Sequence, residues 1–471
     1  MSQNRIKTDL LVIGGGSGGL SLAAGAAQMG AKVVLLEAEK MGGDCLNYGC
    51  VPSKSLLASA KAAHYGSHKS QALGQNKRAR SAAIEHVYRV IDKIKPHDSQ
   101  ERFEGLGVQV IREFGFFVSP DTVRAGEVEI TARRIVISTG SYPFIPPIEG
   151  LSKVDYLTNE TLFQDHSGME HLIILGAGPI GVEMAQAHIR LGMKVSVVEA
   201  ERVLSREDED AARLVQDQLS KEGVTFHTGV MAQKVEKTGG GVSVTLSSGK
   251  TVEGSHLLVA TGRVAKLDGL NLEAAGIKHD ARGVDVDSAL RTSNKKVFAI
   301  GDAAGQMQFT HVAAYHAGLV LRSSLFALPA RQKTGHIPRV VFSDPECAQI
   351  GLTEAASRAK YKARLTVIRE KGATNDRAVA EGRDEGFIKL MIVSGRPVGV
   401  TIVGPQAGEL IAFWSFVFSK NFKLSALTSM VVAYPTRSAL NTKAIGAYFA
   451  PRLFESIWIK RFVRMIQKWV P

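Results

Sequence analysis

The sequence predicts an α/β protein in which two Rossmann-like domains are followed by a smaller α+β module. Three observations lead to this prediction. A strand, a glycine-rich turn, a helix and a second strand occur near the start of the chain and again in its middle. Each copy is followed by an apolar strand that ends in Thr-Gly. From about residue 336 strand-like runs precede helical ones, which is typical of an α+β module.

The repeat covers residues 9–37 and 171–199. Both segments begin with an apolar strand, continue through a glycine turn into a helix, and end on a glutamate after a second strand. A single alignment of the two segments brings five landmarks into register. The aligned pairs are Gly14 with Gly176, Gly16 with Gly178, Gly19 with Gly181, Gly30 with Gly192, and Glu37 with Glu199.

Each copy of the repeat has the chemistry of a dinucleotide site. Its glycines permit a tight turn and let the backbone approach a pyrophosphate, whose charge faces the helix N-terminus. The terminal glutamate accepts hydrogen bonds from ribose hydroxyls. We therefore predict two bound dinucleotides, with a doubly wound fold that binds no nucleotide as the alternative. Glu199 should repel a 2′-phosphate, which favours NADH over NADPH, although Arg202 and Arg206 follow closely and could soften that preference.

Three later segments extend the predicted sheets. IVISTGSYP at 135–143 and LLVATGRVA at 257–265 are apolar strands that end in Thr-Gly, where the backbone can press against a cofactor. They contribute Thr139 and Gly140 to the first nucleotide site and Gly262 to the second. VFAIGDAAG at 297–305 carries Asp302 at the end of a buried strand, and its carboxylate can accept hydrogen bonds from polyol or ribose hydroxyls.

Cys45 and Cys50 lie in the segment GGDCLNYGCVPSK, directly after the first repeat. Their spacing can close as a disulfide where a helix begins, and a helix N-terminus together with Lys54 would lower a thiolate pKa. Two buried cysteines or half of a metal site are the alternatives, but no second Cys/His pair with zinc spacing accompanies them, and we predict no metal site. The third cysteine, Cys347, is expected to be a small buried side chain.

The bulk composition limits the classes of function. The chain has 471 residues, enough for several domains, and a formal net charge of +13. Its basic residues are scattered and do not interleave with aromatic ones, so we expect no nucleic-acid binding. No apolar stretch approaches the roughly 20 residues that span a bilayer. Three cysteines make no structural framework, so we expect a reducing, cytoplasmic location.

Taken together, these segments resemble the flavoprotein disulfide reductases, which include glutathione reductase, dihydrolipoamide dehydrogenase and mercuric reductase. The resemblance covers nearly the whole chain, and GGDCLNYGCVPSK is its most specific part. It implies an enzyme that passes hydride from NAD(P)H through FAD to a Cys45–Cys50 redox disulfide and on to a small acceptor. It also implies a homodimer formed by the C-terminal domain, in which each active site is completed by the partner subunit.

The resemblance further implies a role for individual residues. Cys50 would be the charge-transfer thiol against the flavin, and Cys45 the exposed interchange thiol that meets the acceptor. Lys54 would lie beside the flavin, paired with Glu183. The implied FAD ligands are Gly14, Gly16, Gly19, Glu37, Gly43, Thr139, Gly140 and Asp302. The implied NAD(P) ligands are Gly176, Gly178, Gly181, Glu199 and Gly262.

Four segments follow from the same resemblance. Residues 1–150 would form the first part of the FAD domain, with the redox disulfide, and 151–270 the NAD(P) domain. Residues 271–335 would return to the FAD or central domain. Residues 336–471 would form the C-terminal dimerisation domain with a basic tail helix.

The segment VVAYPTRSALNTK departs from the family pattern. Tyr434 stands where a proton-carrying His belongs, and Ala439 stands where its orienting Glu belongs. A tyrosine with a pKa near 10 is a poor substitute for an imidazole with a pKa near 6.5, so we expect weak turnover of disulfide substrates. A thiophilic metal ion or a quinone would need no such relay. Tyr434 either positions the acceptor or packs at the dimer interface.

Two other functions stay open from the sequence. The first is reduction of mercuric or other thiophilic metal ions, since mercuric reductase also lacks that His. The second is non-enzymatic, a redox sensor that retains only a slow flavin. A further departure is Asp44, which replaces the usual Thr before the first cysteine and should raise the pKa of Cys45.

The last segment, FESIWIKRFVRMIQKWV at 454–470, reads as a basic amphipathic helix. Aromatic and aliphatic side chains lie on one side of it, and Lys and Arg lie elsewhere. Such a helix could rest on an anionic membrane surface as a peripheral contact, or pack on the body of the dimer. The sequence leaves both placements open.

Overall fold

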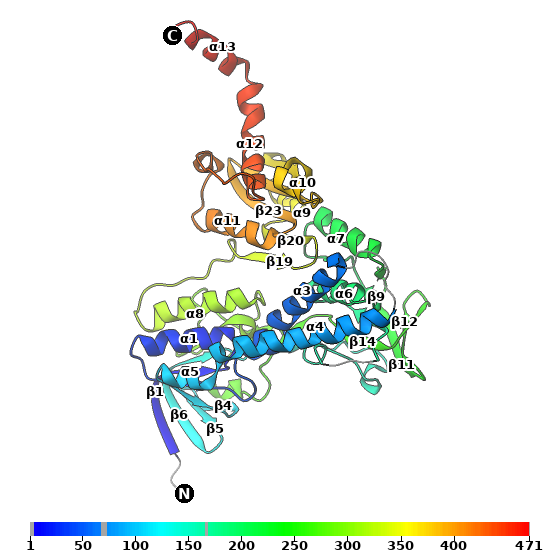
Figure 1. The fold of residues 1–471 in the computed structure, drawn as a ribbon. Helices are drawn as coiled ribbons and strands as arrows, with labels where there is room; N and C mark the ends of the chain where they lie inside the picture. The colour runs from blue at the N-terminus through cyan, green and yellow to red at the C-terminus, as the bar shows by residue number, and fades with distance from the viewer. Residues whose placement is uncertain (1–3, 67–72, 165–167, 471) are drawn as a thin grey trace. The chain divides into compact units, whose positions relative to one another are not determined.

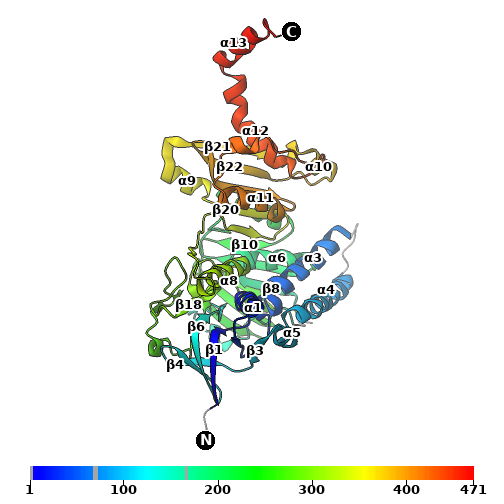
Figure 2. The ribbon, with the colours of Figure 1, turned by 90° about the vertical axis from the view of Figure 1, so that its left-hand side faces the viewer.

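The computed structural model describes residues 4–66, 73–164 and 168–470. The chain forms two compact units (Figures 1 and 2). Unit 1 combines residues 1–177, 187–200 and 229–333, and unit 2 combines residues 178–186, 201–228 and 334–471. Both units mix helices with sheets, as the predicted α/β fold class requires.

A sheet of seven strands lies at the centre of the described part of unit 1. Its order is β3-β2-β1-β6-β5-β4, with β18 beside β6. β3, β2, β1, β6 and β18 run parallel to one another, whereas β5 pairs antiparallel with β6 and β4 pairs antiparallel with β5. The strands are β1 (Asn4–Ile13), β2 (Val33–Leu36), β3 (Val108–Ile111), β4 (Gly115–Ser119), β5 (Thr122–Ala125), β6 (Val128–Ile137) and β18 (Val297–Ala299). All four residues of β2 are buried, because a parallel sheet is covered on both faces.

Two helices that are far apart in the sequence lie side by side in unit 1, α1 (Ser17–Gln28) and α8 (Thr310–Ser324) (Figure 1). Glycine makes this close approach possible. A Cβ built at Gly25 would lie 2.6 Å from Leu321 Cδ1, and one at Gly18 would lie 3.2 Å from the Cβ of Ala313. The small residues of α1 therefore bring the start of α8 close to the first glycine turn.

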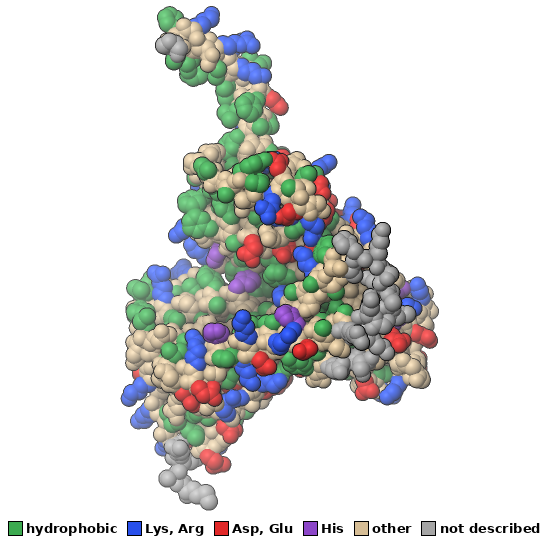
Figure 3. Space-filling view, in the orientation of Figure 1, with side chains coloured by type: hydrophobic (Ala, Val, Ile, Leu, Met, Phe, Trp, Pro, Cys, Tyr) green, Lys and Arg blue, Asp and Glu red, His purple; other side chains and the backbone are tan. Residues whose placement is uncertain are grey.

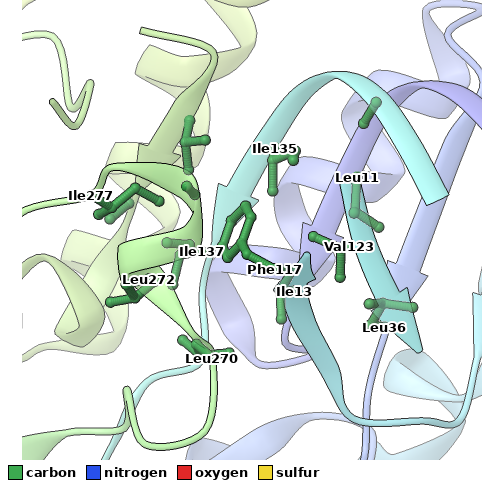
Figure 4. Close-up of a cluster of buried hydrophobic side chains, with 14 of the residues drawn as sticks. Leu11, Ile13, Leu36, Phe117, Val123, Ile135, Ile137, Leu270, Leu272 and Ile277 are labelled. Atoms are coloured by element: carbon green, nitrogen blue, oxygen red, sulfur yellow. The ribbon is translucent and has the colours of Figure 1, made fainter. Parts of the chain in front are cut away.

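Apolar side chains fill the space between this sheet and the segment around residues 270–277 (Figure 4). Phe117 from β4 is fully buried in this cluster, near Ile137 of β6, and its backbone N–H donates to the carbonyl of Leu270 at 2.9 Å. Val123 and Ala125 of β5, two residues apart, also point into this cluster, as the alternation of a strand requires. The cluster fixes one face of the sheet that carries the first repeat.

The second repeat occupies another parallel sheet, in which β9, β8 and β14 are adjacent within unit 1. Helix α6 follows β8, and its residues are divided between the two units. These elements are β8 (His171–Leu175), α6 (Pro179–Arg190), β9 (Lys194–Glu199) and β14 (His256–Val259). Both predicted repeats thus have the expected strand, turn, helix and strand.

Smaller elements complete unit 1. The helices are α2 (Gly43–Asn47), α3 (Cys50–Gly66), α4 (Leu73–Ile94) and α5 (Gln100–Gly105). The strands are β7 (Ser141–Pro143), β11 (Ala232–Thr238), β12 (Gly241–Leu246), β13 (Thr251–Gly254), β15 (Arg263–Ala265), β16 (His279–Asp280) and β17 (Gly283–Val284). β7 pairs with β15, which places residue 141 beside residue 265.

The described part of unit 2 holds an antiparallel sheet of five strands in the order β19-β20-β23-β22-β21 (Figure 2). These are β19 (Pro338–Val341), β20 (Glu346–Gly351), β21 (Leu365–Lys371), β22 (Phe387–Val393) and β23 (Arg396–Gly404). The remaining elements are α7 (Glu209–Lys221), β10 (Thr225–Thr228), α9 (Glu354–Tyr361), α10 (Asp376–Ala380), α11 (Ala407–Ser419), α12 (Ala439–Phe454) and α13 (Ile457–Ile466). The α+β module predicted from about residue 336 is confirmed.

The core of unit 2 lies between its sheet and helices α11 and α12. Trp414 of α11 is fully buried there, and its indole N–H donates to Asn441 of α12 at 2.9 Å. Ile388 and Leu390 of β22 point into this core, so Lys389 between them points to the opposite face of the sheet. Among the described residues, no helix combines the length and the apolar character needed to cross a membrane.

Candidate redox site

The two glycine turns have the same backbone geometry. Gly14 has a φ of 109° and Gly176 a φ of 101°, values that L-residues with a side chain rarely adopt. A Cβ at Gly14 would lie 2.4 Å from the carbonyl oxygen of Ser138, and one at Gly176 would lie 2.5 Å from that of Ala260. Each turn therefore packs directly against the strand end that leads into Thr-Gly, and only glycine fits.

The terminal glutamate of each repeat also makes the same contact. Glu37 accepts a hydrogen bond from the backbone N–H of Gly15 at 2.7 Å, and Glu199 accepts one from Ala177 at 2.6 Å. Both carboxylates are thus held beside their glycine turns, where a ribose would lie. The structure brings together the acid and the turn that the sequence assigned to one site in each repeat.

The cysteine segment is tied to the first glycine turn through its backbone. The N–H of Gly42 donates to the carbonyl of Gly15 at 2.9 Å, and a Cβ at Gly43 would lie 2.7 Å from the Cα of Gly16. Cys45 follows in α2, and Cys50 is the first residue of α3. The cysteine pair is therefore placed beside the predicted FAD turn by direct backbone contact.

Cys45 and Cys50 are free thiols in this structure and hydrogen-bond to each other. Cys50 Sγ also lies 3.3 Å from the hydroxyl of Thr310, at the start of α8. The hydrogen bond from Cys45 lowers the pKa of Cys50 to about 6; Thr310 and Lys54 act in the same direction, against the effect of burial. The same bond to Cys50 raises the pKa of Cys45, and burial adds to the rise. Cys50 is the thiolate of the pair.

Two details differ from the sequence expectations. Cys50 is exposed and Cys45 is half-buried, although Cys45 was expected to be the exposed thiol. The lower pKa belongs to Cys50, the thiol expected to lie against the flavin as a thiolate. The greater exposure also belongs to Cys50, whereas it was expected for Cys45. The charge of Asp44 raises the pKa of Cys50, whereas its effect was predicted for Cys45.

A partly buried polar network connects Asp44 to Asp302. The guanidinium of Arg263 lies 3.2 Å from Asp44 and 3.9 Å from Asp302, and Ser141 donates to Asp302 at 2.5 Å. Asn159 donates to Asp44 at 2.9 Å. Burial raises the pKa of Asp302, and the hydrogen bond from Ser141 and the charge of Arg263 oppose this rise.

Sequence reasoning missed four residues of this site. Arg263 and Ser141 directly follow the two Thr-Gly ends, so their positions could have indicated a role. Thr310 lies eight residues after Asp302 in the sequence, and no pattern singled it out. Asn159 carries no sequence signal. Folding brings all four to the cysteine segment or to Asp302.

Tyr434 lies in unit 2 and is 77% exposed. Its hydroxyl donates to Asp376 at 2.9 Å, and this hydrogen bond raises the pKa of Tyr434. The phenol therefore keeps its proton at neutral pH. Ala439 begins α12, and its side chain has no hydrogen-bonding group.

Glu183 is buried within α6, and its carboxylate accepts a hydrogen bond from the backbone N–H of Phe342 at 2.9 Å. Lys54 belongs to unit 1 and Glu183 to unit 2, so their predicted pairing stays a prediction. Cys347 is fully buried, and burial raises its pKa. Its predicted role as a small packed side chain is confirmed.

Comparison with known proteins decides the family. Residues 8–317 match the family described as pyridine nucleotide-disulphide oxidoreductase, and residues 337–444 match the dimerisation domain of that family. The chain belongs to the pyridine nucleotide-disulphide oxidoreductase family. Its members are FAD enzymes that use a pyridine nucleotide, so this chain is an FAD- and pyridine-nucleotide-dependent oxidoreductase.

Individual relatives differ in their substrates. The chain is 32% identical over 443 residues to the mercuric reductase of Streptomyces lividans, covering 91% of this chain and 93% of the relative. It is 31% identical over 456 residues to the dihydrolipoyl dehydrogenase of Geobacillus stearothermophilus, covering 93% and 96%. The solved Cu(II) complex of the HOCl-induced flavoprotein disulfide reductase RclA from Escherichia coli matches with a TM-score of 0.83 and 26% identity, covering 92% and 98%.

The first turn of this disulfide oxidoreductase fits FAD. Gly16, which caps α1, offers no side chain to the first N–H groups of the helix, and α1 has no acidic residue in its first turn. The N–H groups at the start of a helix suit a pyrophosphate. Among the described residues, the buried hydroxyl of Thr139 has no hydrogen-bond partner in the protein, as expected for a group that faces the cofactor.

The sequence position of Arg202 suggested that it could soften the preference for NADH, but its side chain is engaged elsewhere. Its guanidinium donates to backbone carbonyls of the following loop, at 2.7 Å to Ser205 and 2.8 Å to Glu207. Further bonds reach Leu204 and Val203. Arg202 thus holds its own loop together.

Proposed function

We propose that this enzyme passes two electrons from NADH through FAD to the Cys45–Cys50 disulfide, and from the resulting dithiol to a small acceptor. The observation that carries the proposal is the Cys50 thiol, whose pKa of about 6 and position at the start of α3 make it a thiolate at neutral pH. When bound, FAD accepts the hydride and delivers electrons to the disulfide.

The chain's own residues perform the remaining work. Gly14, Gly16, Gly19 and Gly43 leave room for the backbone to approach FAD, while Glu37 and Asp302 supply acceptors for its hydroxyls. Thr139 and Gly140 would close the same site. Gly176, Gly178, Gly181, Glu199 and Gly262 would do the same for the nicotinamide dinucleotide.

In the last step, the dithiol is oxidised by the acceptor. Two thiolates lose one electron each and form the Cys45–Cys50 disulfide, and the acceptor gains two electrons. Cys45 has the raised pKa, so its proton must leave when the disulfide closes. Lys54, which lowers the pKa of Cys50, stabilises the thiolate form of the pair. The pairing of Lys54 with Glu183 belongs to the same proposal.

We propose a thiophilic metal ion as the acceptor class. Tyr434 supports this choice, because its hydrogen bond to Asp376 keeps the phenol protonated and unable to act as a base near neutral pH. A soft metal ion needs two thiolates and no proton relay. The relatives named mercuric reductase, and the solved Cu(II) complex of a similar reductase, point the same way.

Three further features accompany the proposal. NADH is favoured over NADPH, because Glu199 stands at the ribose position and Arg202 is engaged by its own loop. The dimerisation domain at 337–444 supports a homodimer whose C-terminal domains complete each other's active sites. The segments 1–150, 151–270, 271–335 and 336–471 are proposed as the domains.

An anaerobic titration with NADH tests the relay. The bound flavin should bleach, and a long-wavelength charge-transfer band should appear as Cys50 becomes a thiolate against it. Cys50→Ser should remove the band, whereas Cys45→Ser should leave a band that needs no NADH. A wild-type protein that bleaches without any such band would show that the disulfide takes no part.

A screen of acceptors tests the metal proposal. Hg(II) and Cu(II) should be reduced faster than lipoamide or glutathione disulfide, and Cys45→Ser should abolish the activity. Tyr434→Phe is the matched control, since it should leave metal reduction unchanged. The double variant Tyr434→His with Ala439→Glu should raise lipoamide turnover at least about tenfold, within the usual range of general acid–base catalysis. Faster lipoamide than metal turnover in the unmodified enzyme would contradict the proposal.

A further inference from the structure

Helix α13 and the turn after it contact little else in unit 2. Every residue from 457 to 470 is exposed, and α13 is assigned no buried residue. Trp458 is 78% exposed and Trp469 is 82% exposed, whereas Trp414 in the core is fully buried. Neither side of α13 is covered by its own chain in the described residues.

The side chains of this segment are sorted by type around the helix axis. Continued at about 100° per residue from α13 through the turn after it, eight of the nine apolar side chains occupy an arc of about 160°, and the basic ones occupy a separate arc of about 100°. Ile457, at the first position of the helix, falls within the basic arc. The apolar set is Trp458, Ile459, Phe462, Val463, Met465, Ile466, Trp469 and Val470, and the basic set is Lys460, Arg461, Arg464 and Lys468. Figure 3 shows hydrophobic side chains along one edge of this segment and Lys and Arg along the other.

The charge of the segment selects its partner. Residues 457–470 contain four basic residues and no acidic one. A second copy of this chain carries a net charge of +13, which repels such a segment. An anionic surface attracts it, and each basic group near such a surface adds to the attraction.

The two tryptophans of the segment favour a lipid surface among the possible anionic partners. Trp458 and Trp469 stand near the two ends of the apolar face, and indole rings favour the boundary between water and lipid. The matched dimerisation domain ends at residue 444, so α13 lies outside the part of the chain assigned to subunit contact. The helix is ten residues long, too short to span a bilayer.

We propose that α13 docks this enzyme on the surface of an anionic phospholipid bilayer. The helix lies in the plane of the interface, with its apolar face among the upper acyl chains and its Lys and Arg side chains among the phosphates. The reductase is thereby held at a membrane without crossing it. This inference is independent of the acceptor that the redox site reduces.

Vesicle binding by the full-length enzyme tests the proposal. Vesicles of phosphatidylcholine with phosphatidylglycerol at about three to one should bind the protein and shift its tryptophan emission to the blue, and pure phosphatidylcholine should bind it weakly. The Lys460→Gln, Arg464→Gln double variant should weaken binding about 30-fold, since two surface charges are lost. Phe462→Glu should abolish binding, and Met231→Glu, at an exposed position outside the segment, should leave it unchanged.

Two results would overturn the proposal. One is that truncation after Leu453 leaves the affinity for anionic vesicles unchanged. The other is that Phe462→Glu lowers the oligomer mass in sedimentation and leaves vesicle binding intact, which would make a second copy of the chain the occupant of this face. The flavin content of each variant provides a control for correct folding that does not depend on the acceptor.

Discussion

At the scale of single residues, Cys45 and Cys50 differ more in their chemistry than in their positions. Both lie beside the first glycine turn, yet the pKa of Cys50 is lowered to about 6 while that of Cys45 is raised. The difference arises because one thiol donates its hydrogen bond and the other accepts it, and because Thr310 and Lys54 assist Cys50. Of the two thiols, Cys45 therefore holds its proton more tightly.

The pKa of Cys50 makes a prediction about the reduced enzyme. Because the value is lowered, the thiolate should be present above about pH 6 and should be lost as the pH falls through that value. Cys45→Ala removes the largest cause, so the pKa of Cys50 should rise toward the ordinary range of about 8 to 9. The pH dependence of alkylation of Cys50 by iodoacetamide, with the site mapped by mass spectrometry, measures both values.

Cys347→Ala is the control for this titration, since Cys347 is fully buried and lies in the other unit. It should leave the pH profile of Cys50 as it is. A midpoint that stays near pH 6 in Cys45→Ala would show that the hydrogen bond between the thiols is not the cause.

At the scale of elements, the glycine turn of each repeat is held by two contacts of the same kind. The glycine turn packs on the strand end that leads into Thr-Gly, and the terminal glutamate bonds to the turn. The cysteine segment adds to this in the first repeat, because Gly42 and Gly43 contact Gly15 and Gly16. The cysteine segment is therefore in direct backbone contact with the glycine turn of the proposed FAD site.

The variant Gly14→Ala tests whether the tight packing of this turn is needed to bind FAD. A φ of 109° and a Cβ 2.4 Å from the carbonyl of Ser138 force the turn to move, and the FAD bound per protein should fall roughly tenfold or more. The ratio of flavin to protein absorbance after purification measures the loss. Gly105→Ala, where a Cβ would meet nothing within 4 Å, should bind FAD normally. A full FAD content in Gly14→Ala would contradict the assignment of FAD to the Gly14 turn.

A buried ion cluster joins three elements of unit 2. The ammonium of Lys389, only 3% exposed, lies 2.8 Å from each of Asp208, Asp210 and Glu354. Hydrogen bonds to Lys389 lower the pKa of Asp210 and, against burial, that of Glu354. These two carboxylates therefore stabilise unit 2 above their ordinary pKa values, and the contribution is lost as the pH falls.

Removal of the cation should be costly. Lys389→Met leaves three carboxylates together without a partner and should destabilise unit 2 by about 3–5 kcal/mol at neutral pH. The loss should shrink in acid, where protonation relieves the repulsion. Urea unfolding followed by tryptophan emission measures it, since all three tryptophans lie in unit 2. Lys237→Met, at an exposed ion pair, should change the unfolding free energy by less than about 1 kcal/mol.

At the scale of the whole molecule, the first nucleotide turn and the cysteine pair lie in unit 1, the second turn passes from unit 1 into unit 2 at Gly178, and Tyr434 and α13 lie in unit 2. The proposed FAD site lies in unit 1, so FAD should stabilise that unit by mass action, by about 2.7 kcal/mol at one hundred times its dissociation constant. Removal of FAD should therefore raise amide hydrogen exchange in β1, α1 and the turn at 139–140. Exchange in β22 of unit 2 serves as the internal comparison, and an equal rise there would contradict the assignment of FAD to unit 1.

The sequence by itself determined the fold class, the two nucleotide turns and the cysteine pair. These features are local, because glycine spacing, apolar strands and a terminal acid are read within about 30 residues and have few structural solutions. The same local logic identified the C-terminal module, the amphipathic tail and the buried state of Cys347.

Only the tertiary structure decided which thiol is acidic, and which groups hold Asp44 and Asp302. Thr310 is 260 residues from Cys50, and Arg263 is more than 200 from Asp44, so no local pattern could pair them. Asp44 illustrates the reason: its charge was visible in the sequence, but the thiol it acts on depends on the fold. Hydrogen bonds and burial, which set each pKa, exist only once distant segments have packed together.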